Sequence, residues 1–533
     1  MGVPAVRALG GRHALLLAAG LGALGCSGEG GDEAVLGAAQ ALRPDTPGNS
    51  ELFQFDPGDV VETHGSASGK FLIHFTKAGT HAVPAGDSDA SGVPDFVEEV
   101  ASVYDEVFKR YHDDLGFRPP ASDEAIPIDN GGDGRFDVYL VDFAGVGDGV
   151  FRTDGCDAKN PEVCAGYMVQ ENDYAGYGYP STTIANRILG SHEYFHAVQA
   201  AYDIDQGSVA NEGTAVWATE KFDPSLEDLE AFLSGYLKNT DRTLTEPLPG
   251  PVDPFSYGAA IFFQFLDERY GEATVRALWE RCENGAFGEA NPNWFTALDP
   301  MLKAEAGSSF AEAFVEFAEW NLFTGKSADP ARGYADGADY PTLDFVDVTL
   351  PYTDDALRVF RASAQYYRMD TGGRAAITAA LVPAKDSPSE ADGLAMLLVA
   401  KTGSVLGPVR LVVDPLAGAE MVDATGADQV IVVVVNTLQE GESRRPGFCV
   451  GTPEEVAACR MALVPEEEQP VDPPPPPPPP PPPAEPSEDT GCACGMARPS
   501  PSGGLALLPL AAFLLARRRR ASRARGIASA LSE

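Results

Sequence analysis

An unbroken run of eleven prolines at positions 473–483 limits what this chain of 533 residues can fold into. Proline lacks the backbone N–H that helices and sheets require, so such a run forms an extended polyproline II rod that rises about 3.1 Å per residue. A packed body must therefore be built from the residues before it. We expect residues 467–489 to form a stiff stalk between that body and the residues that follow.

Charge is spread unevenly along the chain. It contains 79 acidic and 38 basic residues, which gives a net charge of −41, yet residues 1–25 and 490–533 are both basic. The part between them is therefore strongly acidic and would repel a phosphate backbone, which argues against a nucleic-acid partner. Hydrophobic residues make up 44% of the sequence, and this is enough for sizeable cores.

The first 26 residues have the pattern of an export signal. Arg7 and Arg12 precede a short apolar run at 14–24, and small residues lead to Cys26. The run is too short to span a bilayer, so we expect a signal peptide. The sequence ALGC that ends at Cys26 also resembles a bacterial lipobox, which would attach a lipid to this cysteine; ordinary cleavage is the alternative. Residues 27–66 are rich in Gly, Asp, Glu and Pro, and we expect a linker there.

Residues 490–533 carry a second set of sorting features. Cys492 and Cys494 lie in a polar stretch, followed by an apolar run at 503–516 and four arginines at 517–520. That run is shorter than the ~20 residues of an ordinary helical span. The arrangement resembles the MYXO-CTERM tail of bacterial surface proteins. The resemblance implies processing near the cysteines and retention at the cell envelope, whereas a plain membrane anchor is the alternative.

Both ends therefore indicate an exported body, either secreted or held at the bacterial cell surface or outer membrane through one or both termini. In an oxidising compartment, cysteines that lie close in sequence can form disulfide bonds. We expect two such bonds, Cys156–Cys164 and Cys449–Cys459.

The body divides into two kinds of sequence. Residues 67–338 combine a few strand-like stretches with long segments that have the apolar spacing of helices. Residues 339–466 contain short alternating runs between turn signals, among them VIVVVV at 430–435, and these predict a β-sandwich. We therefore predict an α+β fold, with a small mixed β-sheet, a central helix and a helical subdomain followed by the sandwich. The expected strands of the first part are 70–75, 136–143 and 167–169, and its expected helices are 96–115, 181–202, 211–221, 226–237, 257–270, 272–282, 294–306 and 310–322.

The segment HEYFH at 192–196 is the most informative one for function. On a helix, its spacing puts His192 and His196 on one face, one turn apart, as a single Zn²⁺ ion requires of two imidazole ligands. Glu193, one position round the helix, is placed to act as a general base towards a water molecule. Only seven histidines occur in the chain and none follows His196, so the third ligand has to be a carboxylate. The candidates are Asp203, Asp205, Glu212 and Glu220.

Glu212 is the favoured candidate for the third ligand. Asp203 and Asp205 lie at the end of the helix or just past it, about 10 Å beyond the second histidine. Glu212 opens a second helix after a turn at Gly207, and two antiparallel helices can aim it at the two imidazoles. Glu220 is the second choice. Two histidines and one glutamate leave the fourth zinc position open, as a catalytic zinc requires.

HEYFHAVQ followed by NEGTAVW resembles the gluzincin zinc metallopeptidases, the thermolysin-like clan, and in particular surface metalloproteases with a MYXO-CTERM sorting tail. The resemblance covers about residues 70–322. It implies that His192, His196 and Glu212 bind Zn²⁺ and that Glu193 activates the water. Similar families also place a tyrosine where it can donate to the oxyanion, and Tyr257 is the candidate. A core aromatic is the alternative for this residue.

One departure from the thermolysin pattern concerns the partner of His192. That pattern has an aspartate four residues after the glutamate ligand, where this chain has Val216. The group that orients His192 is therefore unassigned, and Asn211 or a backbone carbonyl are the candidates.

Two acidic segments have the spacing of calcium loops. In the first, oxygen ligands fall at positions 1, 3, 5, 7, 9 and 12, with Gly92 at position 6. Its expected ligands are Asp87, Asp89, Ser91, the Val93 carbonyl, Asp95 and Glu98. A second, weaker loop comprises Asp129, Asp133, Gly134 and Asp137, with Leu140 in place of the last acid. Ordinary acidic turns are the alternative for both segments.

We therefore expect a secreted or surface-anchored zinc-dependent endopeptidase that hydrolyses a protein or peptide substrate and works as a monomer. One alternative is a catalytically degenerate cell-surface adhesion or structural protein with a peptidase-like fold. Another is a different zinc hydrolase, such as an exopeptidase. No additional acidic motif that would hold a substrate α-amine is evident in the sequence, which favours the endopeptidase.

Overall fold

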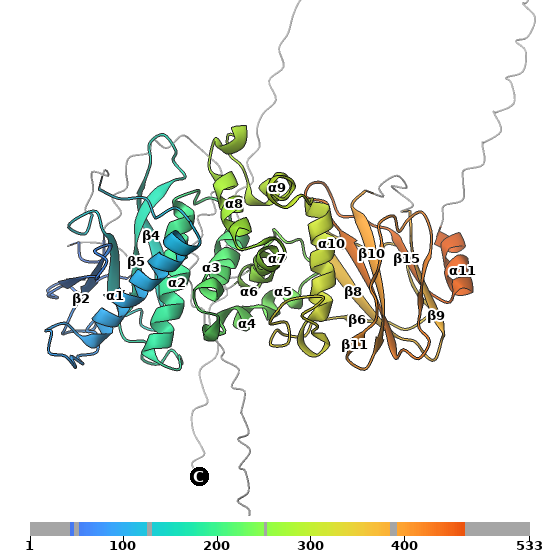
Figure 1. Ribbon diagram of the computed structural model, residues 1–533, viewed down its shortest axis with the longest axis horizontal. Helices are drawn as coiled ribbons and strands as arrows, with labels where there is room; N and C mark the ends of the chain where they lie inside the picture. The colour runs from blue at the N-terminus through green and yellow to red at the C-terminus, as the bar shows by residue number, and fades with distance from the viewer. Residues whose placement is uncertain (1–42, 47–52, 125–129, 250–252, 384–391, 464–533) are drawn as a thin grey trace, which may run out of the picture. The chain divides into compact units, whose positions relative to one another are not determined.

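The structure is a computed structural model, and it describes residues 43–46, 53–124, 130–249, 253–383 and 392–463. The expected signal peptide, stalk and sorting tail, with Cys26, Cys492 and Cys494, lie outside the described residues, as does Asp129. The fold is α+β, as predicted. It comprises an N-terminal mixed sheet with helices, a helical subdomain and C-terminal β-sheets (Figure 1).

The N-terminal sheet has five strands in the order β1-β2-β3-β5-β4. The three inner strands run parallel to one another, and the two edge strands are antiparallel to their neighbours. All three strands expected here are present. The strands are β1 (Glu62–Gly65), β2 (Phe71–Phe75), β3 (Phe136–Val141), β4 (Gly149–Cys156) and β5 (Cys164–Glu171).

Each face of this sheet is covered by a different part of the chain. Helices α1 (Asp95–Phe108) and α2 (Thr182–Ala200) pack on one face, and α1 continues as a π-helical turn, Lys109–Asp114 (Figure 1). On the other face, Phe55 is buried against Tyr139, Tyr167 and their neighbours. The expectation of a linker throughout 27–66 is therefore wrong at its end, because residues 53–65 bury side chains on the sheet and form its edge strand β1.

The helical subdomain follows α2. It differs from expectation at Leu233, where the predicted helix 226–237 is divided into α4 and α5, and at Ala259, where α6 ends before α7 begins. The chain packs tightly here, since a Cβ atom on Gly235 would lie 1.7 Å from the carbonyl oxygen of Pro254. The helices are α3 (Ser208–Phe222), α4 (Asp228–Phe232), α5 (Ser234–Leu237), α6 (Pro254–Gly258), α7 (Ala260–Tyr270), α8 (Ala273–Cys282), α9 (Trp294–Met301) and α10 (Phe310–Trp320).

The C-terminal part consists of two sheets whose inner faces share one hydrophobic core. One sheet has the order β11-β10-β14-β8-β6, with β12 also paired to β10, and the other has the order β13-β9-β15-β7. Most pairs are antiparallel, and β6 with β8 is parallel. The strands are β6 (Val346–Asp347), β7 (Tyr352–Asp354), β8 (Ser363–Asp370), β9 (Ala376–Val382), β10 (Leu394–Thr402), β11 (Val405–Leu406), β12 (Arg410–Val412), β13 (Glu420–Asp423), β14 (Gln429–Asn436) and β15 (Gly447–Gly451).

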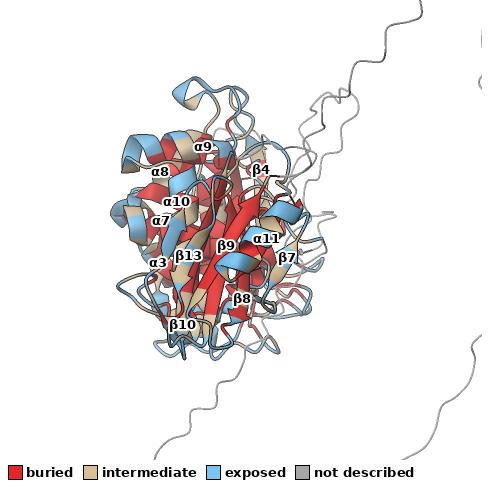
Figure 2. Ribbon diagram, turned by 90° about the vertical axis from the view of Figure 1, so that its right-hand side faces the viewer, coloured by how far each residue is buried: buried red, intermediate tan, exposed pale blue. Residues whose placement is uncertain are grey.

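Strand β14 explains why VIVVVV is apolar throughout. Val432 and its alternate neighbours point into the core between the two sheets, whereas Ile431, Val433 and Val435 join the core of the helical subdomain. The hydroxyl of Tyr366 on neighbouring β8 donates to the carbonyl of Ala318 on α10, at 2.9 Å. A strand buried on both faces has no polar alternation. The outer helix α11 (Pro453–Leu463), by contrast, is mostly exposed (Figure 2).

Both expected disulfides are present, Cys156–Cys164 between β4 and β5 and Cys449–Cys459 between β15 and α11. Disulfides are typical of proteins outside the cytoplasm. In the part of the chain that the structure describes, no helix has the length and apolar character needed to cross a membrane.

Candidate metal centre

Helix α2 carries the two histidines of HEYFH on one face. The Ser181 side chain caps the helix by accepting the backbone N–H of Ile184, and the helix then runs without interruption past His196. The ring centroids of His192 and His196 lie 5.0 Å apart, with the ring planes at 82°. The uninterrupted helix thus delivers both imidazoles to one place, as their four-residue spacing predicts.

Glu212 meets the two imidazoles from the next helix. Its Oε2 atom lies 3.3 Å from Nε2 of His192 and 3.6 Å from Nε2 of His196. Helices α2 and α3 are packed neighbours, joined by a turn at Gly207, whose φ of 79° suits a residue without a side chain. Two imidazole nitrogens and one carboxylate oxygen that converge in this way form a group that can hold a metal ion.

The other carboxylates considered as ligands lie elsewhere. Asp203 is fully buried and accepts the backbone N–H of Asp205 at 2.8 Å. Glu220 lies two turns further along α3, where burial, with the charge of Glu230, raises the pKa of its carboxyl to about 7. None of the three belongs to the group formed by the two histidines, so the choice of Glu212 agrees with the geometry.

His196 is held in place by Gln199, which the sequence reasoning missed. Nδ1 of His196 donates to Oε1 of Gln199 at 2.8 Å, and Nε2 of Gln199 donates to the Asn211 carbonyl and to Thr214 Oγ1 at 2.7 and 2.9 Å. These hydrogen bonds turn Nε2 of His196 towards Glu212. Metal-binding histidines commonly have such a hydrogen-bond partner on their other ring nitrogen. The backbone carbonyl of Asn211 accepts from Gln199, and the group that orients His192 stays unassigned.

The charges of the group are strongly coupled. Burial alone would raise the pKa of Glu212, but the charge of His196 and hydrogen bonds from both imidazoles hold it well below its usual range. Burial would lower the pKa of His196, and the Glu212 carboxylate reverses this and raises it to about 9. Burial raises the pKa of Glu193, while the two histidines act in the opposite direction. A cation at this point would satisfy Glu212 without requiring protonated imidazoles.

A small cavity opens beside His192 and Glu193. The ring of Tyr257 is nearly parallel to that of His192, with centroids 5.9 Å apart and an angle of 13°, and it also stacks on Phe232. Tyr257, the expected oxyanion donor, therefore lies at the site. Two carboxylates that sequence reasoning missed, Asp148 and Asp228, line the same cavity.

The first acidic loop brings together Asp87, Asp89 and Asp95, whose oxygens lie within 4.8 Å of one another. Ser91 Oγ donates to Glu98 Oε1 at 2.9 Å. The same carboxylates also accept backbone N–H groups of the loop, as ordinary acidic turns do. A calcium ion held by these side chains and the Val93 carbonyl stays a prediction.

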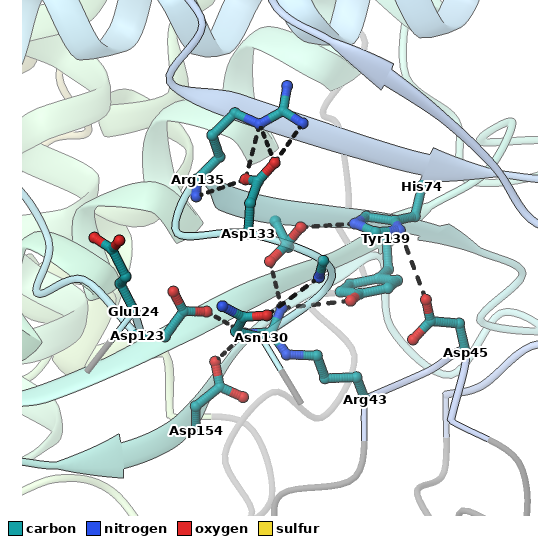
Figure 3. Close-up of polar contacts among 12 residues, drawn as sticks. Arg43, Asp45, His74, Asp123, Glu124, Asn130, Asp133, Arg135, Tyr139 and Asp154 are labelled. Carbon is teal, nitrogen blue, oxygen red and sulfur yellow. Dashed lines mark hydrogen bonds and ion pairs between the residues drawn. The ribbon is translucent and has the colours of Figure 1, made fainter. Parts of the chain in front are cut away.

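The prediction of a second calcium loop is wrong. Asp137 lies on β3, is 1% exposed and pairs with the guanidinium of Arg43 and, at 2.7 Å, with Nε2 of His74. Figure 3 shows Arg43 and His74 in this network. Asp133 instead pairs with Arg135. The strand directs the Asp137 carboxylate into a buried network, where Asp123 and Asp154 also bind Arg43. The loop spacing carried no information about this distant arginine.

No family model and no curated protein match this chain. Among solved structures, the chain is similar to aminopeptidase A of Legionella pneumophila in complex with aspartic acid, with a TM-score of 0.31 and 10% sequence identity. The match covers 71% of this chain and 36% of that one, so this chain spans about a third of the length of the aminopeptidase.

Proposed function

We propose that this protein is a zinc-dependent peptidase that cleaves proteins or peptides outside the cytoplasm. The observation that carries the proposal is the convergence of His192, His196 and Glu212, with Glu193 beside them at the wall of a cavity. Two imidazoles and a carboxylate are the ligand set of catalytic rather than structural zinc, because they leave a position open.

His192, His196 and Glu212 would hold a zinc ion, which would serve as a Lewis acid for the substrate carbonyl group and for water. Glu193 accepts the proton of the attacking water and passes it to the nitrogen of the leaving group. The hydroxyl of Tyr257 donates a hydrogen bond to the carbonyl oxygen as negative charge develops there. Gln199 keeps His196 in the orientation that this arrangement needs.

The proposal extends to the cellular setting. The two disulfides support export, and the lipobox-like and MYXO-CTERM-like ends support anchoring at the cell envelope, with the proline-rich segment as a stalk. We propose a monomeric enzyme that cleaves within chains. A degenerate adhesion protein would have no need of a base beside a metal site, and Glu193 is present at the cavity wall.

The test combines metal analysis with a peptide cleavage assay on the purified protein. We expect about one zinc per molecule, cleavage of casein or of a mixed peptide library, and loss of cleavage in the Glu193→Gln variant with zinc retained. A protein that binds zinc but cleaves no peptide would contradict the peptidase and support the binding protein.

A further inference from the structure

Asp228 is a buried carboxylate that has no hydrogen-bond partner in the described part of the chain. It is the first residue of α4, its exposed fraction is 2%, and neither of its oxygens accepts a hydrogen bond within the described residues. It lines the cavity beside His192 and Tyr257. Buried polar groups are nearly always paired, and a carboxylate left unpaired is among the most costly exceptions. Asp228 therefore points to a ligand that enters this cavity.

Asp148 contributes a second carboxylate to the same cavity. It precedes β4, the edge strand, and its Oδ2 accepts the hydroxyl hydrogen of Tyr179 at 2.6 Å. The next residue, Gly149, lies against the base, since a Cβ atom there would be 3.1 Å from Cγ of Glu193. This contact places Asp148 close to the reacting centre of the proposed enzyme.

The lining of the cavity is complementary to a cation. Among the residues that the structure describes, it contains three carboxylates, those of Asp148, Glu193 and Asp228, and no lysine or arginine. Phe232 and Tyr257 add two stacked rings, with centroids 4.9 Å apart, and aromatic faces also attract cations. The cavity volume of about 60 Å³ holds a few water-sized groups, which fits an ammonium with a short length of its carbon chain.

We propose that this cavity is the subsite that binds a primary ammonium group of the peptide substrate, next to the bond that is cleaved. The inference rests on the proposed peptidase function and adds the substrate class. The ammonium has two sources in peptides, a lysine side chain and the free α-amine. Recognition of the first gives cleavage beside lysine, in line with the proposed cleavage within chains. Recognition of the second gives removal of residues from the N-terminus and would replace cleavage within chains, while the peptidase function itself would stand.

The first test measures binding and does not depend on turnover. Zinc-loaded Glu193→Gln protein is titrated calorimetrically with three matched peptides: an N-acetylated peptide with lysine, its norleucine counterpart, and the norleucine peptide with a free N-terminus. We expect at least one ammonium-bearing peptide to bind about tenfold more tightly than the acetylated norleucine peptide, as for a charge-assisted hydrogen bond. The peptide that binds more tightly identifies the source of the ammonium group. Equal binding of all three overturns the inference.

The second test assigns the preference to the carboxylates. Introducing Asp228→Asn or Asp148→Asn should remove most of the tenfold difference, whereas Asp113→Asn on an exposed turn outside the cavity should keep it. Retention of the full preference in both cavity variants contradicts the assignment. If the Asp228→Asn variant fails to fold, the Asp148→Asn variant still tests the assignment. The comparison of the three peptides on protein with both aspartates intact still tests the subsite.

Cleavage by the unaltered protein separates the two proposals. If no peptide is cleaved at all, the proposed function fails, while the binding titration still reports on the cavity. If peptides are cleaved with the same kcat/KM whether or not they carry an ammonium near the bond, the peptidase stands and the subsite is refuted.

Discussion

Nδ1 of His196 lies 2.8 Å from Oε1 of Gln199, three residues further along the same helix. The amide of Gln199 is in turn fixed by the Asn211 carbonyl and by Thr214, both on α3, the helix that carries Glu212. A single side chain therefore links the orientation of one imidazole to the position of the helix that carries the third ligand.

Replacement of this glutamine should weaken metal binding. In the Gln199→Leu variant, His196 loses the acceptor that orients it, and we expect zinc affinity to fall by about tenfold or more. Competition with a chromophoric chelator measures this change. Gln199→Glu keeps an acceptor for His196 and should lose less affinity. An unchanged affinity in Gln199→Leu would show that the contact plays no part in metal binding.

The identity of the third ligand can be tested with two glutamates of one helix. Glu212→Gln should abolish stoichiometric zinc and lower activity by about a thousandfold, because one of three ligands is lost. Glu220→Gln, two turns away, should retain zinc. Metal content after dialysis, measured by mass spectrometry, distinguishes them, and loss of zinc in Glu220→Gln alone would reverse the assignment.

Glu220 should also make stability depend on pH. Burial, with the charges of Glu230 and Asp336, raises its pKa to about 7 in the folded state, whereas an unfolded chain has a glutamate pKa of about 4.3. Between these values the folded state binds the additional proton, so this residue's contribution to stability falls as pH rises and levels off above 7. In the Glu220→Gln variant, the free energy of unfolding should change less with pH. At pH 8 this variant should be more stable than the unaltered protein by about 2 kcal/mol.

Urea unfolding at pH 5 and pH 8 measures this difference. The comparison is between variant and unaltered protein at each pH, because other buried carboxylates such as Asp154 and Glu171 also have a raised pKa and contribute to the slope. If the free energy of unfolding of the variant changed with pH as much as that of the unaltered protein, Glu220 would be ruled out as a source of the pH dependence.

Arg43 should be important for stability. Its guanidinium is fully buried and pairs with Asp137 and with Asp123 and Asp154 (Figure 3). Arg43→Met leaves these carboxylates without their cation, and we expect a loss of about 3 kcal/mol in the free energy of unfolding. Arg135→Met removes the more exposed pair with Asp133 and should cost less than ~1 kcal/mol. Equal losses in urea unfolding would contradict this account.

Sequence reasoning succeeded where function depends on local periodicity. The spacing of His192 and His196 is a property of any helix, and the turn at Gly207 makes Glu212 a geometrically accessible ligand. The strands and most helices were likewise evident from alternation and apolar spacing, because one face of each is buried.

The features that were missed depend on contacts between distant segments. Asp148 and Asp228 sit at the beginnings of β4 and α4, where no period marks them, and only packing brings them to one cavity. Arg43 lies in a segment without periodicity, so its burial could not be inferred from its neighbours in sequence. Asp137 belongs to the expected strand 136–143, and the spacing of nearby acidic residues also suggested a calcium ligand, but the strand directs its carboxylate to Arg43 and His74.

The two-sided burial of β14 has a practical consequence for anyone who wishes to produce residues 67–338 alone. A truncation after residue 338 would remove Ile431, Val433 and Val435 and expose the apolar surface of the helices that they cover. Such a fragment should be poorly soluble, because the C-terminal sheets cover this apolar surface, and expression should retain residues up to the end of α11.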